Sequence, residues 1–240
     1  MNDRTGRTAC SLEPGIRIPR PFWRGTKPGN SVAEKIPAKK WAIIKHARSG
    51  SNLFRQWNPG KTSQDKQGEE YVKLIRTVRN GMEALKKQGH APVLKAMVWQ
   101  QGEGDARDIA GIKNALSYGA NLNNLIKRIR ADLEAPGLAF IYGSVLPVPA
   151  PARFPGREEV RQGQKDVAGE SRTSRTPYPT DTVHLGTHGI LALGERFASA
   201  LEKLWRQKTD TPDLFSSPLS PAPPAPSGKP IMFDIPPGCG

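Results

Sequence analysis

The chain has 240 residues, of which 36% are apolar and 24% are charged. That is enough for one sizeable hydrophobic core, and it excludes a peptide or a mainly disordered chain. The net charge of +14 makes polyanions candidate partners. However, no RNP, zinc-finger or helix-turn-helix signature accompanies it, so nucleic-acid binding is not expected. No run approaches the roughly 18 apolar residues of a membrane helix, so no membrane association is expected.

The two ends of the chain differ from its middle. Residues 1–50 hold 11 Lys and Arg against 3 acidic residues, and residues 207–240 are rich in Pro and Ser. We predict an irregular basic segment over 1–31, one folded domain over 32–206 and a disordered tail over 207–240. The start lacks the apolar core of a secretory signal, so we expect a cytoplasmic protein as written, or an exported one if the true start lies upstream.

The middle of the chain alternates short apolar runs with amphipathic stretches. The apolar runs predict strands over 41–44, 92–99 and 139–143. Apolar residues at helical spacing predict helices over 71–85, 118–133, 157–168 and 187–205. Alternating strands and helices indicate an α/β fold, with a parallel sheet covered by helices on both faces.

Polar segments follow the first two strands, and a third precedes the last helix. They cover residues 48–52, 100–105 and 181–185. Ligands of open parallel sheets bind outside the carboxyl ends of the strands, so we expect the functional site here.

The third polar segment contains Asp181 and His184, three residues apart at the entrance of a predicted helix. The carboxylate could orient the imidazole, leaving its other nitrogen free to take a proton from a nucleophile. Two alternatives remain open. Asp181 could simply cap the helix, or Asp181, His184 and His188 could face a metal ion.

The second polar segment reads Trp-Gln-Gln-Gly-Glu over residues 99–103. The side-chain amide of Gln101 could donate a hydrogen bond at the end of a strand, and Gly102 would let a substrate approach the backbone. The alternative is an ordinary turn in which Trp99 belongs to the core.

Four motifs stand in a fixed order along the chain: SGSNL over 49–53, WNPG over 57–60, WQQGEGD over 99–105 and DTVHL over 181–185. Their order and spacing resemble the SGNH-type hydrolases, specifically the sialate O-acetylesterase or carbohydrate esterase family 6 group. The resemblance covers about residues 32 to 205. It implies a three-layer, flavodoxin-like parallel sheet and removal of O-acetyl groups from a carbohydrate or another small ester.

The resemblance also implies roles for single residues, with no metal or organic cofactor. His184 corresponds to the base and Asp181 to the acid that orients it. Gly50 and Gln101 correspond to the donors that stabilise the oxyanion of the transition state. Glu103 would support these groups without touching the substrate, or serve as an alternative acid.

The serine nucleophile has no clear counterpart, because the Gly-Gln-Ser-Asn block that carries it in the family is absent before Trp41. Ser31 follows no apolar strand. Ser51 does follow a predicted apolar strand. However, the WNPG motif after Ser51 and the single helix between Ser51 and Gln101 match the second sequence block of the family, not the first block, which carries the serine. We therefore expect a missing or altered first strand and a truncated or altered amino terminus. The alternative function is a non-catalytic, glycan-binding remnant of the fold.

Overall fold

The computed structural model describes residues 35, 40–107, 112–145, 152–168, 187–209 and 231–234. In this part of the chain, three parallel strands form one sheet in the order β1 (Ala96–Trp99), β2 (Ala139–Ser144) and β3 (Ile231–Asp234). The helices are α2 (Glu69–Lys87), α3 (Glu103–Ala106), α4 (Lys113–Leu116), α5 (Tyr118–Asp132), α6 (Arg157–Ala168) and α7 (Thr187–Thr209). The α/β prediction is confirmed. None of the described helices could span a membrane.

The four predicted helices are confirmed as α2, α5, α6 and α7, with small differences at their ends. Helix α2 illustrates why the pattern is reliable. It has acidic residues in its first turn and Lys86 and Lys87 in its last, as the helix dipole favours. Its buried stripe includes Tyr71, Leu74, Ile75 and Val78. Side chains three and four residues apart share one helix face, so these residues reach the core together.

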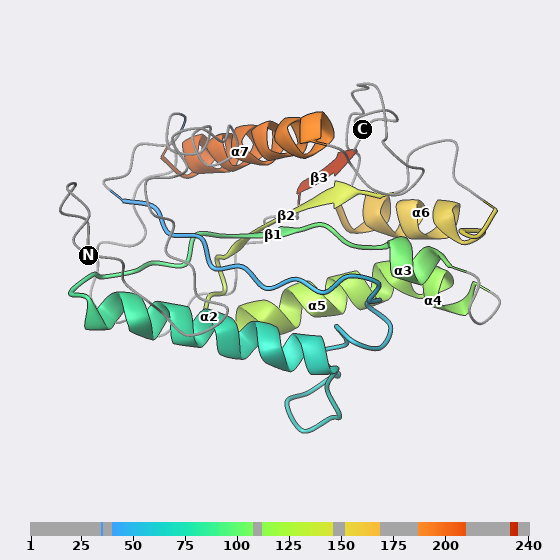
Figure 1. Ribbon diagram of the computed structural model, residues 1–240, viewed down its shortest axis with the longest axis horizontal. Coiled ribbons are helices and arrows are strands. Elements are labelled where there is room, and N and C mark those ends of the chain that lie inside the picture. Colours follow the sequence, from blue (N-terminus) through green and yellow to red (C-terminus); the bar gives the residue numbers. More distant parts are fainter. Residues whose placement is uncertain are drawn as a thin grey trace, which may run out of the picture.

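The sheet lies between helices on its two faces (Figure 1), with α7 on one side and α2 and α5 on the other. The side chains of β2 reach the helices on both sides, because successive side chains of a strand point to opposite faces of the sheet. Phe140 and Tyr142 belong to the larger core cluster with residues of α2 and α5. Ile141, between them, packs with Ala200 and Leu201 of α7.

The predicted strands over 92–99 and 139–143 correspond to β1 and β2, although β1 begins only at Ala96. The predicted strand over 41–44 is wrong, because residues 40–48 have no regular secondary structure. None of the described strands pairs with this segment, although it is partly buried. Trp41 packs against the cluster beneath α7, whereas Ile44 packs against the larger cluster and Ile43 is 49% exposed.

Within the predicted tail over 207–240, residues 231–234 form β3 and residues 207–209 extend α7. Strand β3 pairs in parallel with β2, with Ile141 opposite Ile231 and Ser144 opposite Asp234. The apolar sequence Ile-Met-Phe after Pro230 allows this, since it supplies a short strand for the open edge of β2. The remainder of the predicted tail, and the predicted basic segment over 1–31, lie outside the described residues.

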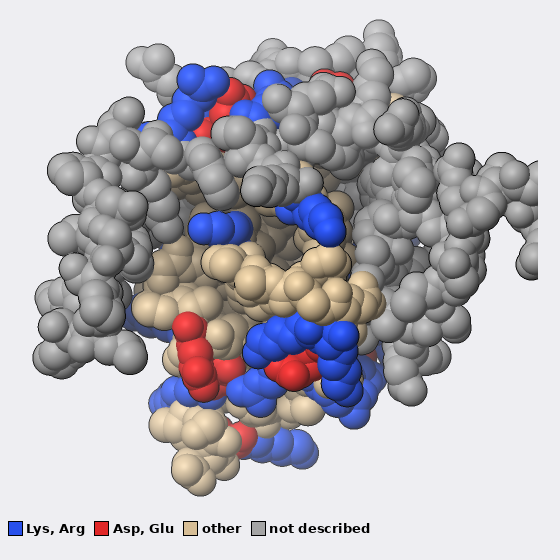
Figure 2. Space-filling model, turned by 90° about the vertical axis from the view of Figure 1, so that its left-hand side faces the viewer, with Lys and Arg blue, Asp and Glu red and all other residues tan. Residues whose placement is uncertain are grey.

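Positive charge is prominent on the side of the molecule where β1 and β2 begin. Figure 2 shows this side, with Lys and Arg spread over the lower half and acidic side chains among them. Helix α2 ends on this side of the molecule (Figure 1), and its last turns contain an ion pair of 2.8 Å between Lys86 and Glu83. Since Gln101 follows the opposite end of β1, this charge lies away from the predicted site.

Candidate active site

The carboxyl end of β1 brings together the described members of the predicted site. The Nε2 atom of Gln101 lies 3.2 Å from the backbone oxygen of Ser51, and Gly50 precedes that serine. Glu103 begins α3 two residues after Gln101. Asp181, His184 and Ser31 lie outside the described residues, and His188 lies in the first turn of α7. The structure thus joins two sequence motifs that are about 50 residues apart.

The hydroxyl of Ser51 is occupied on both sides. It donates a hydrogen bond of 2.7 Å to the backbone oxygen of Arg48 and accepts one of 2.7 Å from Nε1 of Trp57. Trp57 in turn packs edge-on against Trp99, with ring centroids 5.1 Å apart. Ser51 is only 6% exposed. Acting as a nucleophile would require this hydroxyl to exchange both partners.

The side chain of Gln101 is 8% exposed, and its amide nitrogen uses both hydrogens. Nε2 donates to Oδ2 of Asp105 at 2.7 Å and, over the longer distance of 3.2 Å, to the oxygen of Ser51. Its backbone oxygen accepts a hydrogen bond of 2.6 Å from the hydroxyl of Tyr118. A substrate oxyanion could replace the longer contact to Ser51 while the shorter one to Asp105 remains.

Glycines allow the two motifs to approach each other. A Cβ atom on Gly104 would lie 2.2 Å from the oxygen of Ser51, so no other residue fits between α3 and this loop. Gly50 has a φ of +67°, a left-handed conformation that other residues adopt only with strain. It is exposed, and a Cβ atom there would meet nothing within 4 Å. Gly50 is therefore required for the turn of the backbone.

Asp105 is a residue of this site to which the sequence analysis gave no role. Its side chain is completely buried, and it accepts hydrogen bonds from the backbone nitrogens of Leu53 (2.8 Å) and Phe54 (3.0 Å) as well as from Gln101. Burial raises the pKa of this carboxyl above its ordinary value, although the three hydrogen bonds oppose the shift. Gln101 lies two residues before α3, so helical spacing gave no signal for this pair, although both residues stand in the motif over 99–105.

A second buried side chain, Gln164 of α6, links the ends of β1 and β2, because its amide also lies 3.5 Å from the backbone oxygen of Gln101. It donates to the backbone oxygen of Gly143 at 3.1 Å and accepts from the nitrogen of Val145 at 3.2 Å. Its own backbone oxygen accepts a hydrogen bond from the hydroxyl of Tyr142. Gln164 stands among the apolar positions of α6, between Val160 and Val167, which was the signal for its burial.

The loop before Ser51 is held to α2 by a buried acid. Glu70 is 1% exposed and accepts hydrogen bonds of 2.8 Å from Nε2 of His46 and from Nζ of Lys73. Arg48 adds a longer ion pair of 3.7 Å. Burial alone would raise the pKa of Glu70, but its hydrogen bonds to Lys73 and His46 lower that pKa below the ordinary value. This cluster fixes where the chain enters the loop that carries Gly50.

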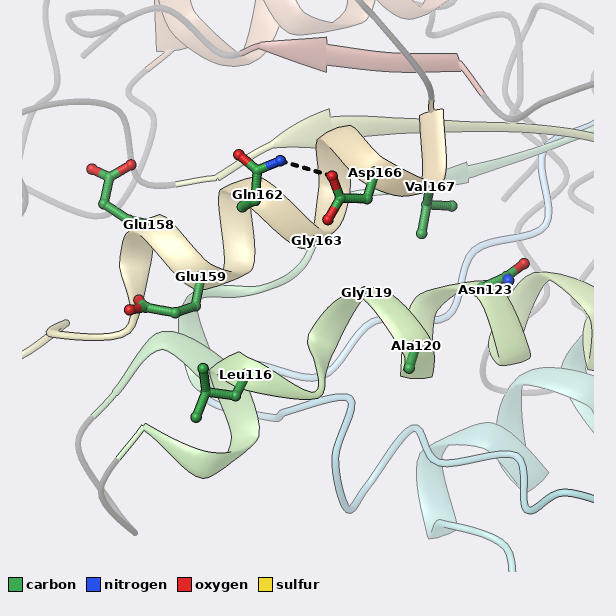
Figure 3. Close-up of a pocket in the computed structure, with 10 residues that line it drawn as sticks. All are labelled: Leu116, Gly119, Ala120, Asn123, Glu158, Glu159, Gln162, Gly163, Asp166 and Val167. Atoms are coloured by element: carbon green, nitrogen blue, oxygen red, sulfur yellow. Dashed lines mark hydrogen bonds between the residues drawn. The ribbon is translucent and has the colours of Figure 1, made fainter.

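A pocket of about 730 Å³ lies elsewhere, between α5 and α6. Figure 3 shows that its lining residues come from α4, α5 and α6. None of the residues of the predicted site lines it. We therefore place the candidate active site at the end of β1 and not in this pocket.

Comparison with known proteins gives the following. A family model described as carbohydrate esterase, sialic acid-specific acetylesterase matches residues 18–203. The probable carbohydrate esterase At4g34215 of Arabidopsis thaliana is 26% identical over 201 residues, which are 82% of this chain and 65% of that protein. An X-ray structure of the Arabidopsis protein has a TM-score of 0.57 and 24% identity, covering 73% of this chain and 66% of the other. This chain thus spans about two thirds of its relative's length.

Proposed function

Because the chain belongs to the carbohydrate esterase, sialic acid-specific acetylesterase family, we propose that it hydrolyses O-acetyl esters of a carbohydrate. The observation that carries this proposal is the contact at the carboxyl end of β1 between the amide of Gln101 and the backbone oxygen of Ser51, the residue after Gly50, from motifs about 50 residues apart. An ester hydrolase needs hydrogen-bond donors from separate segments that converge where negative charge develops. The finer arrangement that we propose is the three-layer fold of the SGNH-type hydrolases.

The proposed reaction is a serine-type acyl transfer. The imidazole of His184, oriented by Asp181, takes the proton of a serine hydroxyl while the serine oxygen attacks the acetyl carbon. The carbonyl oxygen becomes an oxyanion, which the backbone N–H of Gly50 and the amide of Gln101 stabilise. The imidazolium then gives its proton to the departing sugar oxygen, and water hydrolyses the acetyl-enzyme by the same route in reverse. Glu103 supports the donors or replaces Asp181 as the acid.

The nucleophile is the open part of the proposal. Ser51 is a candidate by position, but its hydroxyl already bonds to Arg48 and Trp57. This observation favours a second candidate function, a glycan-binding protein that retains the fold without the reaction. The family's Gly-Gln-Ser-Asn block has no counterpart between residue 1 and Trp41 of this sequence.

Hydrolysis of p-nitrophenyl acetate by the purified chain separates these possibilities when Ser51→Ala and His184→Ala are measured beside it, with circular dichroism as the check of folding. Loss of activity in both variants assigns Ser51 as the nucleophile. Loss with His184→Ala alone indicates another nucleophile. A folded chain without activity supports the glycan-binding function instead, and binding of an acetylated oligosaccharide then tests it.

A further inference from the structure

The carboxylate of Asp105 joins two segments that are far apart in the sequence. Oδ1 accepts from Phe54, while Oδ2 accepts both from Leu53 and from the side chain of Gln101. Leu53 and Phe54 belong to the loop that begins at Gly50, whereas Gln101 follows β1. A completely buried carboxylate is costly unless donors surround it, and here three donors do so. The carboxylate of Asp105 therefore fixes the distance between the loop that begins at Gly50 and the side-chain amide of Gln101.

The carboxylate also selects the orientation of the Gln101 amide. A terminal amide has a donating nitrogen and an accepting oxygen of nearly equal size. It can therefore rotate by about 180° when both orientations find hydrogen-bond partners. An ionised carboxylate only accepts, and hence only Nε2 can face Asp105. The oxygen Oε1 is then directed to the hydroxyl of Tyr118, 3.4 Å away, and the second hydrogen of Nε2 to the oxygen of Ser51.

We propose that Asp105 is a positioning residue, which acts by holding the Gln101 amide with its nitrogen toward the loop of Gly50. The inference rests on the proposed esterase function. Without the negative charge, the amide could present its oxygen toward the loop and repel an oxyanion instead of stabilising it. Asp105 touches neither substrate nor reacting atoms in this role.

The test is Asp105→Asn, compared with Gln101→Ala and with the double variant. An Asn side chain has one acceptor where the carboxylate has two, so the amide loses its preference. We expect Asp105→Asn to lower kcat for p-nitrophenyl acetate by about 10- to 100-fold, a loss no greater than that caused by removing an oxyanion donor. KM should change by less than about threefold. The double variant should be no slower than Gln101→Ala alone, since Asp105 acts through Gln101. Losses that multiply in the double variant would overturn the inference.

The chain offers a matched control in Gln162 and Asp166 of α6. Nε2 of Gln162 donates to Oδ1 of Asp166 at 2.7 Å, four residues away, which repeats the contact of Gln101 with Asp105 at an exposed position. Asp166→Asn should leave kcat and KM unchanged. A fall of kcat equal to that of Asp105→Asn would show that the effect is not specific to the site and would overturn the inference.

A second measurement needs no activity and no variant that might fail to fold. Hydrogen exchange of the side-chain amides, followed by NMR in the wild-type chain, should be markedly slower for Gln101 than for Gln162, because only the former bond is buried. Exchange of Gln101 as fast as that of Gln162 would overturn the inference, whether or not the chain is an esterase. Protected exchange in a chain without hydrolysis would instead refute the proposed function and leave the orienting contact established.

Discussion

Substituting Gly163 by Ala tests the packing that places α6 beside the site. Gly163 and Gly119 face each other where α6 crosses α5, and a Cβ atom on Gly163 would lie 2.6 Å from the nitrogen and 2.9 Å from the Cα of Gly119. Both atoms belong to the backbone, so they cannot turn aside as a flexible side chain could. The two helices would have to separate.

Two effects of opposite sign decide the outcome. Ala is favoured over Gly inside a helix by about 1 kcal/mol. Overpacking a close contact costs about 1–3 kcal/mol, and two contacts with backbone below 3.0 Å place this one at about 2–3 kcal/mol. We therefore expect Gly163→Ala to lower the free energy of unfolding by about 1–2 kcal/mol, or the melting temperature by roughly 2–8 °C.

Urea denaturation followed by circular dichroism measures this change, with Asn123→Ala as the control. Asn123 is an exposed residue of α5, so its substitution should be neutral or stabilise by a few tenths of a kcal/mol through helix propensity. If Gly163→Ala is more stable than the wild type, the close crossing of α5 and α6 is refuted, since propensity alone would then govern the change.

Three further predictions concern the site and its supports. Gln101→Ala should lower kcat for an acetyl ester by about 10²- to 10³-fold, measured by steady-state kinetics, and an unchanged kcat in a folded variant would remove Gln101 from the oxyanion role. Tyr118→Phe should lower the free energy of unfolding by about 1–3 kcal/mol, because the backbone oxygen of Gln101 would lose the hydrogen bond from the Tyr118 hydroxyl and keep only the 3.5 Å contact with the amide of Gln164. An unchanged urea midpoint would contradict this. The lowered pKa of Glu70 means that its stabilising contribution is present at neutral pH and is lost as pH falls through that pKa. The difference in urea midpoint between wild type and Glu70→Gln should therefore shrink from pH 7 to pH 3, and a difference that grows on acidification would contradict the assignment.

Periodicity was sufficient for most of the fold. The helical spacing of Leu122, Leu125, Ile126 and Ile129 in α5, for example, reflects a buried stripe that any packing of this chain must satisfy. The run over 41–44 misled, because an apolar run shows that residues will be buried but not that their backbone will pair with a neighbouring strand. Strand β3 escaped prediction since its pairing depends on an edge of β2 almost 90 residues earlier in the chain.

The site was predictable where a motif carried the signal and unpredictable where burial decided the role. Gly50 and Gln101 stand in motifs, and the structure brings those motifs together. Asp105 lies in the same motif as Gln101, but only the tertiary fold shows that it is completely buried and bonded to the loop of Gly50. The hydroxyl contacts of Ser51 were likewise invisible in the sequence, because Trp57 reaches it through the fold of the loop.

The central proposal is that this chain removes acetyl groups from carbohydrates. Release of acetate from an O-acetylated sialic acid and from acetylated xylan, measured enzymatically for the full chain and for His184→Ala, tests it most directly. The account predicts acetate release from at least one of these substrates by the wild type and its loss in the variant. A folded wild-type chain that releases no acetate from either, or a His184→Ala variant that releases it equally fast, would contradict the claim.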